Sequence, residues 1–193
     1  EAATGQGEAG ARAPAAIAPT FGKTLPPIGF VEFCRREPEA CTALWTGRVR
    51  PHLSARQWDL VFRVNAYVNA AVAPASDQAL YGEPEHWAYP VKQGDCEDYA
   101  LLKQRYLEAM GIGRGALLIT VVLDDKGDGH AVLMLAASEG DFVLDNRRND
   151  IRRWGEAGYT FLKRQSERDP RNWVSLTRGT DGSGALAIRS TEP

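Results

Sequence analysis

One cysteine in the chain has neighbours suited to nucleophilic chemistry. Cys96 follows Gly94 and Asp95, and apolar residues then recur at three- and four-residue steps, as one buried face of a helix requires. This spacing places Cys96 in the first turn of a helix, where unpaired N–H groups and the helix dipole favour a thiolate. A thiolate is the nucleophile of cysteine-dependent acyl transfer. The residues expected on the buried face are Tyr99, Leu102, Tyr106 and Met110.

Three carboxylates beside this cysteine oppose its ionisation. Asp95, Glu97 and Asp98 adjoin Cys96 in the sequence, and negative charges raise the pKa of a neighbouring thiol unless a positive group offsets them. The sequence therefore calls for a histidinium, a bound cation, or both near Cys96.

An imidazole and a third orienting group would complete the chemistry. His130 opens a predicted strand at 130–135, and Asp145 ends another at 142–145, after a turn near 138–140. If that turn holds an even number of residues, Asp145 shares a face with His130, because strand side chains alternate. Taken singly, Cys96 could be a small buried residue, His130 a half-exposed polar residue and Asp145 a turn former. Together, Cys96, His130 and Asp145 indicate a catalytic triad.

The elements that must position these residues predict an α+β fold in which the nucleophile helix packs on an antiparallel sheet. A helix should run from an N-cap at Ser54 to Pro74, with Asn65 and Asn69 on its apolar stripe as partners for buried backbone. The residues 116–123 should form a strand before 130–135. The aromatic residues Tyr159, Phe161 and Trp173 predict a further strand or two at the sheet edge, and residues 21–33 an irregular strand or loop.

The length and the hydrophobic content are those of an ordinary globular protein. At 193 residues and 44% hydrophobic content, the chain is long enough for one domain with a core, expected over residues 21–178. Residues 1–20, rich in Ala, Gly and Pro, are expected to be a flexible leader of the kind that follows a cleaved signal peptide or a cloning truncation. Residues 179–193 are expected to be a flexible tail.

Charge and hydropathy exclude two classes of partner. The 23 basic and 25 acidic residues nearly cancel, and no basic run stands out, so nucleic acid and anionic membrane are not expected partners. No apolar run approaches the roughly 18 to 20 residues that cross a bilayer, so the protein is not expected to be membrane-embedded.

Two further cysteines lie close together in the sequence. Cys34 and Cys41 would be about 10 Å apart on a continuous helix, too far for a disulfide. Pro38 breaks that helix and allows the segment to fold back. The pair is expected to form a disulfide, the alternative being two small buried thiols. A disulfide would place the protein in the periplasm or outside the cell.

Three blocks of sequence resemble a known family. Residues 94–99 (GDCEDY), 127–132 (GDGHAV) and 141–146 (DFVLDN) are similar to the bacterial transglutaminase-like cysteine peptidases, and the similarity runs from about Pro27 to Trp173. The resemblance implies a papain-like or transglutaminase-like core. It implies Cys96 as nucleophile, His130 as general base and acid, and Asp145 as the residue that orients the imidazole.

The resemblance also implies Ca²⁺ beside the nucleophile, bound through Asp95 and Glu97, with Asp98 as a possible further ligand. Hard carboxylate oxygens suit Ca²⁺, and its charge would offset the acids that crowd the thiol. The alternative is that Asp95 is an N-cap and the other two acids only complement the helix dipole. Asp124, Asp125 and Asp128 look like part of a calcium loop, but they lack its downstream Glu and are expected at a solvated hairpin tip.

An oxyanion hole would need two donors. The backbone N–H of Cys96 is one candidate. The Tyr89 hydroxyl or the Trp87 indole N–H, from the aromatic-rich segment ahead of Cys96, is a candidate for the second. Either aromatic residue could instead serve packing alone.

The expected function is that of a periplasmic or secreted, calcium-associated cysteine endopeptidase acting through a thioester acyl-enzyme. Its partner would be a protein substrate, for which the family suggests a large surface adhesin, and an inner-membrane receptor could regulate it. Two alternatives stay open: an acyltransferase that passes the acyl group to an amine in cross-linking or amidation, and a catalytically idle module that binds a peptide.

Overall fold

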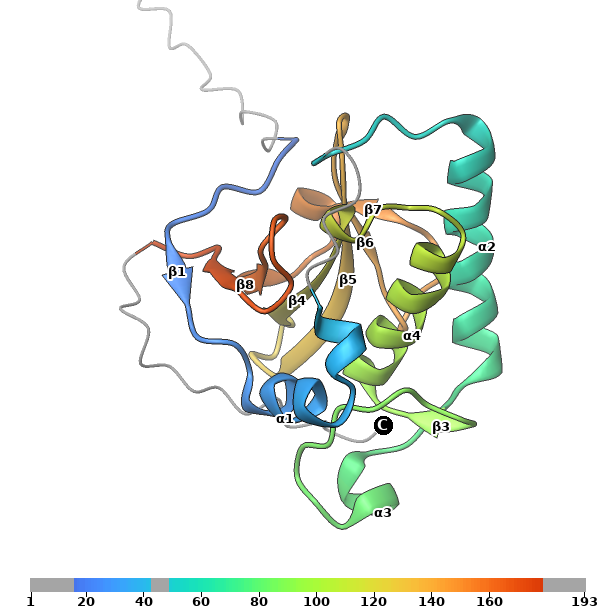
Figure 1. Cartoon of the computed structure of the whole chain (residues 1–193), viewed down its shortest axis with the longest axis vertical. Coiled ribbons are helices and arrows are strands. Elements are labelled where there is room, and N and C mark those ends of the chain that lie inside the picture. Colours follow the sequence, from blue (N-terminus) through green and yellow to red (C-terminus); the bar gives the residue numbers. More distant parts are fainter. Residues whose placement is uncertain (1–15, 43–48, 179–193) are drawn as a thin grey trace, which may run out of the picture.

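The structure, a computed structural model, describes residues 16–42 and 49–178. Its centre is a seven-stranded sheet in which every neighbouring pair is antiparallel (Figure 1). In spatial order the strands are β1 (Lys23–Thr24), β9 (Trp173–Ser175), β8 (Thr160–Gln165), β4 (Leu117–Leu123), β5 (Gly129–Ala137), β6 (Gly140–Leu144) and β7 (Arg152–Arg153).

The helices lie around this sheet, and two short strands form a separate parallel pair. The helices are α1 (Ile28–Arg36), α2 (Ala55–Ala71), α3 (Asp77–Tyr81) and α4 (Cys96–Ala109), with 3-10 turns at Pro38–Cys41, Arg114–Ala116 and Trp154–Glu156. The parallel pair is β2 (Ala73–Pro74) with β3 (Gln93–Gly94). The predicted α+β fold, with the helix that begins at Cys96 packed on an antiparallel sheet, is confirmed.

Helix α4 lies between the sheet and α2 (Figure 1). One sheet face packs on α4 through the odd-numbered residues of β5, such as Leu133 and Leu135. The even-numbered residues, such as Val132 and Met134, belong to a second apolar cluster on the other face. Met110 is 49% exposed rather than buried as expected, because α4 ends one residue before it.

Helix α2 begins and ends close to where its sequence predicts. The Ser54 side chain accepts a hydrogen bond from the Gln57 N–H, and the Gln57 side chain accepts one from the Ser54 N–H, which together form a capping box. These two bonds satisfy donors that a helix start otherwise leaves unpaired. The helix therefore has a fixed start from which its buried face reaches α4.

Residues 28–36 correct one prediction. The segment 21–33 was expected to be irregular, but Ile28–Arg36 forms α1, which buries Phe30 and Phe33. The residues Pro26 and Pro27 dominate the sequence pattern, and Pro27 is in fact the N-cap of the helix. Proline is compatible with a helix start, because the first N–H groups of a helix have no partner there.

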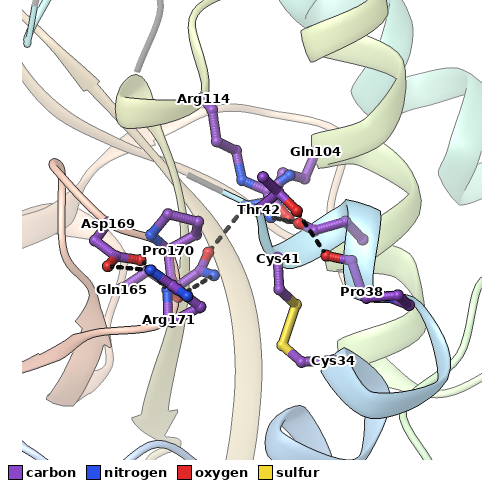
Figure 2. The surroundings of a disulfide bond; sticks show 11 residues. Cys34, Pro38, Cys41, Thr42, Gln104, Arg114, Gln165, Asp169, Pro170 and Arg171 are labelled. Carbon is purple, nitrogen blue, oxygen red and sulfur yellow. Dashed lines mark hydrogen bonds and ion pairs between the residues drawn. A yellow bond between two sulfur atoms is a disulfide. The ribbon is translucent and has the colours of Figure 1, made fainter. Parts of the chain in front are cut away.

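The predicted disulfide joins Cys34 in α1 to Cys41 in the following 3-10 turn, with a Cα–Cα distance of 5.6 Å (Figure 2). The helix stops at Arg36, and the chain folds back at Pro38 as expected. The Arg114 guanidinium donates to the Ala40 carbonyl, which ties this fold-back to the 3-10 turn that precedes β4.

Most of the predicted flexible ends, residues 1–15 and 179–193, lie outside the described residues. Residues 16–20 are described, and two backbone groups there contact the first residues of β6. The Asp141 N–H donates to the Ala16 carbonyl, and the Ala18 N–H donates to Asp141 Oδ2. Within the described residues, no helix combines the length and apolar character needed to cross a membrane.

Candidate active site

Cys96 is the first residue of α4, and its sulfur meets β5 at an open edge. Strand β6 pairs with β5 only as far as Leu133, which faces Leu144. Beyond that pair, the Ala131 N–H donates to Cys96 Sγ at 3.4 Å. The sulfur therefore lies against the backbone of the residue that follows His130.

His130 and Asp145 lie on one face of the sheet, diagonal to each other across β5 and β6. The turn between the strands has two residues, since Ala137 pairs with Gly140, and an even turn gives the predicted alternation. His130 Nε2 is 3.0 Å from Asp145 Oδ1, and both side chains are buried. Both belong by register to the sheet face opposite α4, and the contact from Cys96 Sγ to this strand is with the Ala131 N–H, next to His130.

The Asp145 carboxylate is surrounded by donors. Besides His130, the Arg147 N–H donates to Oδ1 at 3.1 Å, and the Tyr159 hydroxyl donates to Oδ2 at 2.6 Å. Arg148 Nε lies 3.7 Å from Oδ2. Burial opposes ionisation, but the hydrogen bonds from His130, Tyr159 and the Arg147 N–H outweigh it and hold the pKa of Asp145 well below its usual range.

Two asparagines of α2 fix the loop that carries Asp145. Asn69 Nδ2 donates to the carbonyls of Asp145 and Arg148 at 2.9 Å each. Asn65 Nδ2 donates to the Asn149 carbonyl at 3.1 Å. Both amides bind backbone carbonyls as predicted, but of the accepting residues only Asp145 is buried, and through Asn69 helix α2 positions the acid of the His130–Asp145 pair.

A cluster of acids adjoins Cys96, since two of its members are the residues before and after it. Asp77, Asp95 and Glu97 each offer an oxygen, and these oxygens lie within 4.8 Å of one another. All three residues are buried. Asp77 Oδ1 and Glu97 Oε1 have no hydrogen-bond partner in the structure, a costly state for buried carboxylates. Asp77 follows the N-cap of α3 and has no local sequence pattern that marks it as part of the cluster.

The cluster fits a hard cation. Carboxylate oxygens converge from three residues, two of them with an oxygen left unsatisfied, and Ca²⁺ takes six to eight oxygen ligands of this kind. Burial, followed by the charge of Asp95, raises the pKa of Glu97 well above its usual range. Burial also raises the pKa of Asp77. Without a cation, this site favours protonated acids.

The same surroundings act on the thiol. Cys96 Sγ donates to Glu97 Oε2 at 3.0 Å. Burial first, and then the charges of Glu97 and Asp95, raise the pKa of Cys96 well above its usual range, while the Ala131 N–H lowers it. The conflict between helix start and neighbouring acids that the sequence indicates is therefore present in the structure.

Asp98 has a different environment from the cluster. Its Oδ1 accepts the Ala88 N–H at 2.7 Å, and burial raises its pKa to about 8. A Cβ at Gly94 would lie 2.6 Å from Asp98 Oδ2, so only glycine fits there. Asp98 thus supports the backbone next to the site through Oδ1, while its Oδ2 has no hydrogen-bond partner and its role as a further calcium ligand stays a prediction.

The two aromatic candidates for the oxyanion hole have packing contacts. Trp87 is fully buried, and its indole N–H donates to Glu85 Oε1 at 3.1 Å. The Tyr89 ring contacts Phe33 of α1 at 5.3 Å between centroids and lies under the Arg105 guanidinium at 4.5 Å. The role of Tyr89 as oxyanion donor stays a prediction.

A family model described as bacterial transglutaminase-like cysteine proteinase matches residues 20–181. No curated protein matches the sequence. Among solved structures, calcium-bound LapG of Legionella pneumophila is 20% identical, with a TM-score of 0.53, over 82% of this chain and 94% of that one.

Two other LapG structures from the same organism are also similar. One is 22% identical, with a TM-score of 0.52, over 63% of this chain and 71% of that one. An EGTA-treated form is 24% identical, with a TM-score of 0.49, and the match spans 56% of this chain and 62% of that one. The first two likenesses support the fold. Because the family model covers most of the sequence, the chain belongs to the bacterial transglutaminase-like cysteine proteinases and is a cysteine peptidase.

Proposed function

We propose that the protein is a periplasmic, calcium-dependent cysteine endopeptidase in which Cys96, His130 and Asp145 act as a triad. The observation that carries this proposal is the buried His130–Asp145 hydrogen bond of 3.0 Å beside a sulfur held by the Ala131 N–H. These two contacts support a site in which Cys96 is the nucleophile, His130 the base and Asp145 the orienting acid, the set that acyl transfer requires.

The orientation of the imidazole assigns the proton transfers. When Nε2–H donates to Asp145, Nδ1 is the nitrogen that can accept the Cys96 proton. The thiolate then attacks a peptide carbonyl, and the imidazolium returns the proton to the leaving amine. Water hydrolyses the resulting thioester, with His130 again as base. The Cys96 N–H, at the start of α4, is the donor proposed for the oxyanion.

Calcium would be held by Asp77, Asp95 and Glu97. Its two positive charges would offset the carboxylates that raise the pKa of Cys96. Support comes from the oxygens of Asp77 and Glu97 that lack a partner and from the calcium-bound state of the similar LapG. The Cys34–Cys41 disulfide supports an oxidising compartment, hence the periplasm.

The substrate is proposed to be a protein, with a large surface adhesin as the leading candidate and an inner-membrane receptor as a possible regulator. The test is digestion of a proteome-derived peptide library with calcium present, analysed by mass spectrometry, for wild type and Cys96→Ala. We expect new peptide ends with wild type only. Cleavage by folded Cys96→Ala would overturn the nucleophile assignment.

The same digestion separates hydrolysis from amine transfer. A fluorescent primary amine added to the reaction would be incorporated at the new carboxyl ends if an amine resolves the acyl-enzyme efficiently. We expect free carboxyl ends to dominate, and dominant amine incorporation would make the protein an acyltransferase.

A further inference from the structure

Tyr159 is brought to the His130–Asp145 pair by the register of three strands. His130 pairs with Val122 of β4, and Val122 pairs with Phe161 of β8. Tyr159 lies two residues before Phe161, just ahead of β8, so its side chain belongs to the same sheet face as His130. Gly158, with φ of +81°, provides the left-handed turn that leads the chain into this position.

Tyr159 touches both members of the pair. Its hydroxyl donates to Asp145 Oδ2 at 2.6 Å, and its ring lies 5.5 Å from the His130 ring, centroid to centroid, at an interplanar angle of 42°. One side chain therefore contacts the carboxylate at the oxygen that His130 does not use and the imidazole on its ring.

The Tyr159 hydroxyl donates to the Asp145 oxygen that the other hydrogen-bond donors do not reach. Oδ1 of Asp145 has two hydrogen bonds, from His130 Nε2 and the Arg147 N–H. Oδ2 has one hydrogen bond, from Tyr159, because Arg148 Nε at 3.7 Å is beyond hydrogen-bond distance. A buried carboxylate oxygen without a donor is unfavourable, and the group would rotate or tilt to find one. Such a movement would turn Oδ1 away from His130.

We propose that Tyr159 is a positioning residue for the reaction, whose hydroxyl locks the Asp145 carboxylate so that Oδ1 stays on His130 Nε2. This inference rests on the proposed function and adds a fourth member to the proposed triad. Within the described residues, the hydrogen bonds of Cys96 Sγ are with Glu97 and Ala131, so Tyr159 would act through Asp145. The ring holds the imidazole in place while the hydroxyl holds the acid.

The test compares Tyr159→Phe with Tyr99→Phe. Phenylalanine keeps the ring and removes only the hydroxyl. Tyr99 is a matched control, because its hydroxyl donates to the Val72 carbonyl at 2.5 Å, away from Asp145. Both variants lose one tyrosine hydrogen bond, and Tyr159→Phe should lose more stability because its partner is a carboxylate rather than a carbonyl. Only Tyr159→Phe should change the His130–Asp145 pair.

Two readouts follow the pair, both with calcium present. The first is the rate of Cys96 alkylation by iodoacetamide at pH 7, expected to fall about tenfold or more in Tyr159→Phe and less than twofold in Tyr99→Phe. The second is the downfield NMR resonance of the His130 Nε2 proton, expected to shift or broaden only in Tyr159→Phe. Asp145→Asn completes a double-mutant cycle. In that background Tyr159→Phe should reduce the alkylation rate little further, because the carboxylate is already gone.

The outcomes separate this inference from the proposed function. If wild type cleaves peptides and alkylates fast, but Tyr159→Phe matches Tyr99→Phe in both readouts, the positioning role is overturned and the triad stands. If Cys96→Ala retains cleavage, the proposed function fails first. If Tyr159→Phe does not fold, fluorotyrosine can replace Tyr159, because it keeps the shape of the side chain and makes its hydroxyl a stronger hydrogen-bond donor. The His130 Nε2 proton resonance should then shift. An unchanged resonance would overturn the inference.

Discussion

Asp145 and the cluster of Asp77, Asp95 and Glu97 are all buried carboxylates, yet the two sites have opposite electrostatics. Asp145 has hydrogen-bond donors on both oxygens, and these keep its pKa low despite burial. The acids Asp77 and Glu97 each retain an oxygen without a donor, and burial raises the pKa of both. The protein itself supplies the hydrogen-bond donors that keep Asp145 ionised, whereas the acid cluster requires a proton or a cation from solution.

This difference shows what burial alone does not determine. A carboxylate removed from water stays charged where N–H and O–H groups replace the lost hydration, and it takes a proton or a cation where they do not. Asp145 is thus built to be a permanent anion for His130. The cluster favours neutralisation by a proton or a cation, and in the proposed function a calcium ion beside Cys96 would supply it.

The largest effect is expected from Asp145→Asn. The amide offers one oxygen and one NH₂ group, so it cannot remain an anion that accepts from all the present donors. We expect peptide cleavage to fall on the order of 10⁴-fold, as replacing the acid of a Ser-His-Asp triad by Asn does. Added calcium should not restore it. A decrease of less than tenfold in the folded variant would show that Asp145 is not the orienting group.

Buried Lys103, in the helix α4 that begins at Cys96, provides a second contrast with Asp145, and this one depends on pH. Lys103 is 1% exposed, its Nζ lies 6.0 Å from the Tyr99 ring centroid, and burial lowers its pKa to about 7 despite the charge of Asp145. Between about pH 7 and 10.4, the unfolded chain binds more protons at this lysine than the folded one, so stability rises with pH. Unlike Asp145, this charge has no hydrogen-bonded partner in the described residues.

Lys103→Met should therefore be more stable than wild type at pH 6 by a few kcal/mol, with an advantage that shrinks above about pH 7. The measurement is urea unfolding of both proteins at pH 6, 8 and 9.5, where groups common to the two cancel. A difference that does not change with pH would contradict the low pKa of Lys103.

Calcium should act on the acid cluster alone. At a free concentration one hundred times Kd, binding contributes about 2.7 kcal/mol, enough to raise the melting temperature by roughly 5 to 10 °C for a chain of this size. Glu97→Gln should be more stable than wild type without calcium, because it removes a crowded charge, and less stable with it. Asp77→Asn should also reduce the calcium shift.

The matched control for the calcium experiment is Asp124→Asn, at the tip of the β4–β5 hairpin. Asp124 accepts hydrogen bonds from the Lys126 and Asp128 N–H groups and pairs with Arg147, so its oxygens are already used. Its variant should keep the full calcium shift. An equal loss in Asp124→Asn and Glu97→Gln would remove the cluster as the calcium site.

The fold was predictable where one residue pattern dominated a segment. Helical periodicity gave α2 and α4, and alternation with turn residues gave the β4–β5–β6 meander. The even turn after Ala137 let strand parity place Asp145 on the face of His130. Helix α1 was missed because two prolines obscured its short apolar face, although proline is compatible with a helix start.

The surroundings of the candidate site were less predictable than its three central residues. Asp77 and Tyr159 reach the site from segments distant in sequence, through α3 and through the register of β8. Neither has a local pattern that distinguishes it from an ordinary helix-start acid or a strand aromatic. Their positions depend on tertiary packing, which no single segment encodes.

The smallest effect is expected from Arg147→Ala, which separates the two donors that this residue provides. The Arg147 guanidinium pairs with Asp124 at 3.0 Å near the surface, while its backbone N–H donates to Asp145 Oδ1. Partly exposed ion pairs contribute little to stability, and alanine keeps the N–H. Peptide cleavage should therefore stay within twofold of wild type, and the His130 proton resonance should not shift. A large loss would mean that the hairpin tip, and not the set of donors around the carboxylate, keeps Asp145 in place, and the contrast between the two acid groups would then need a different cause.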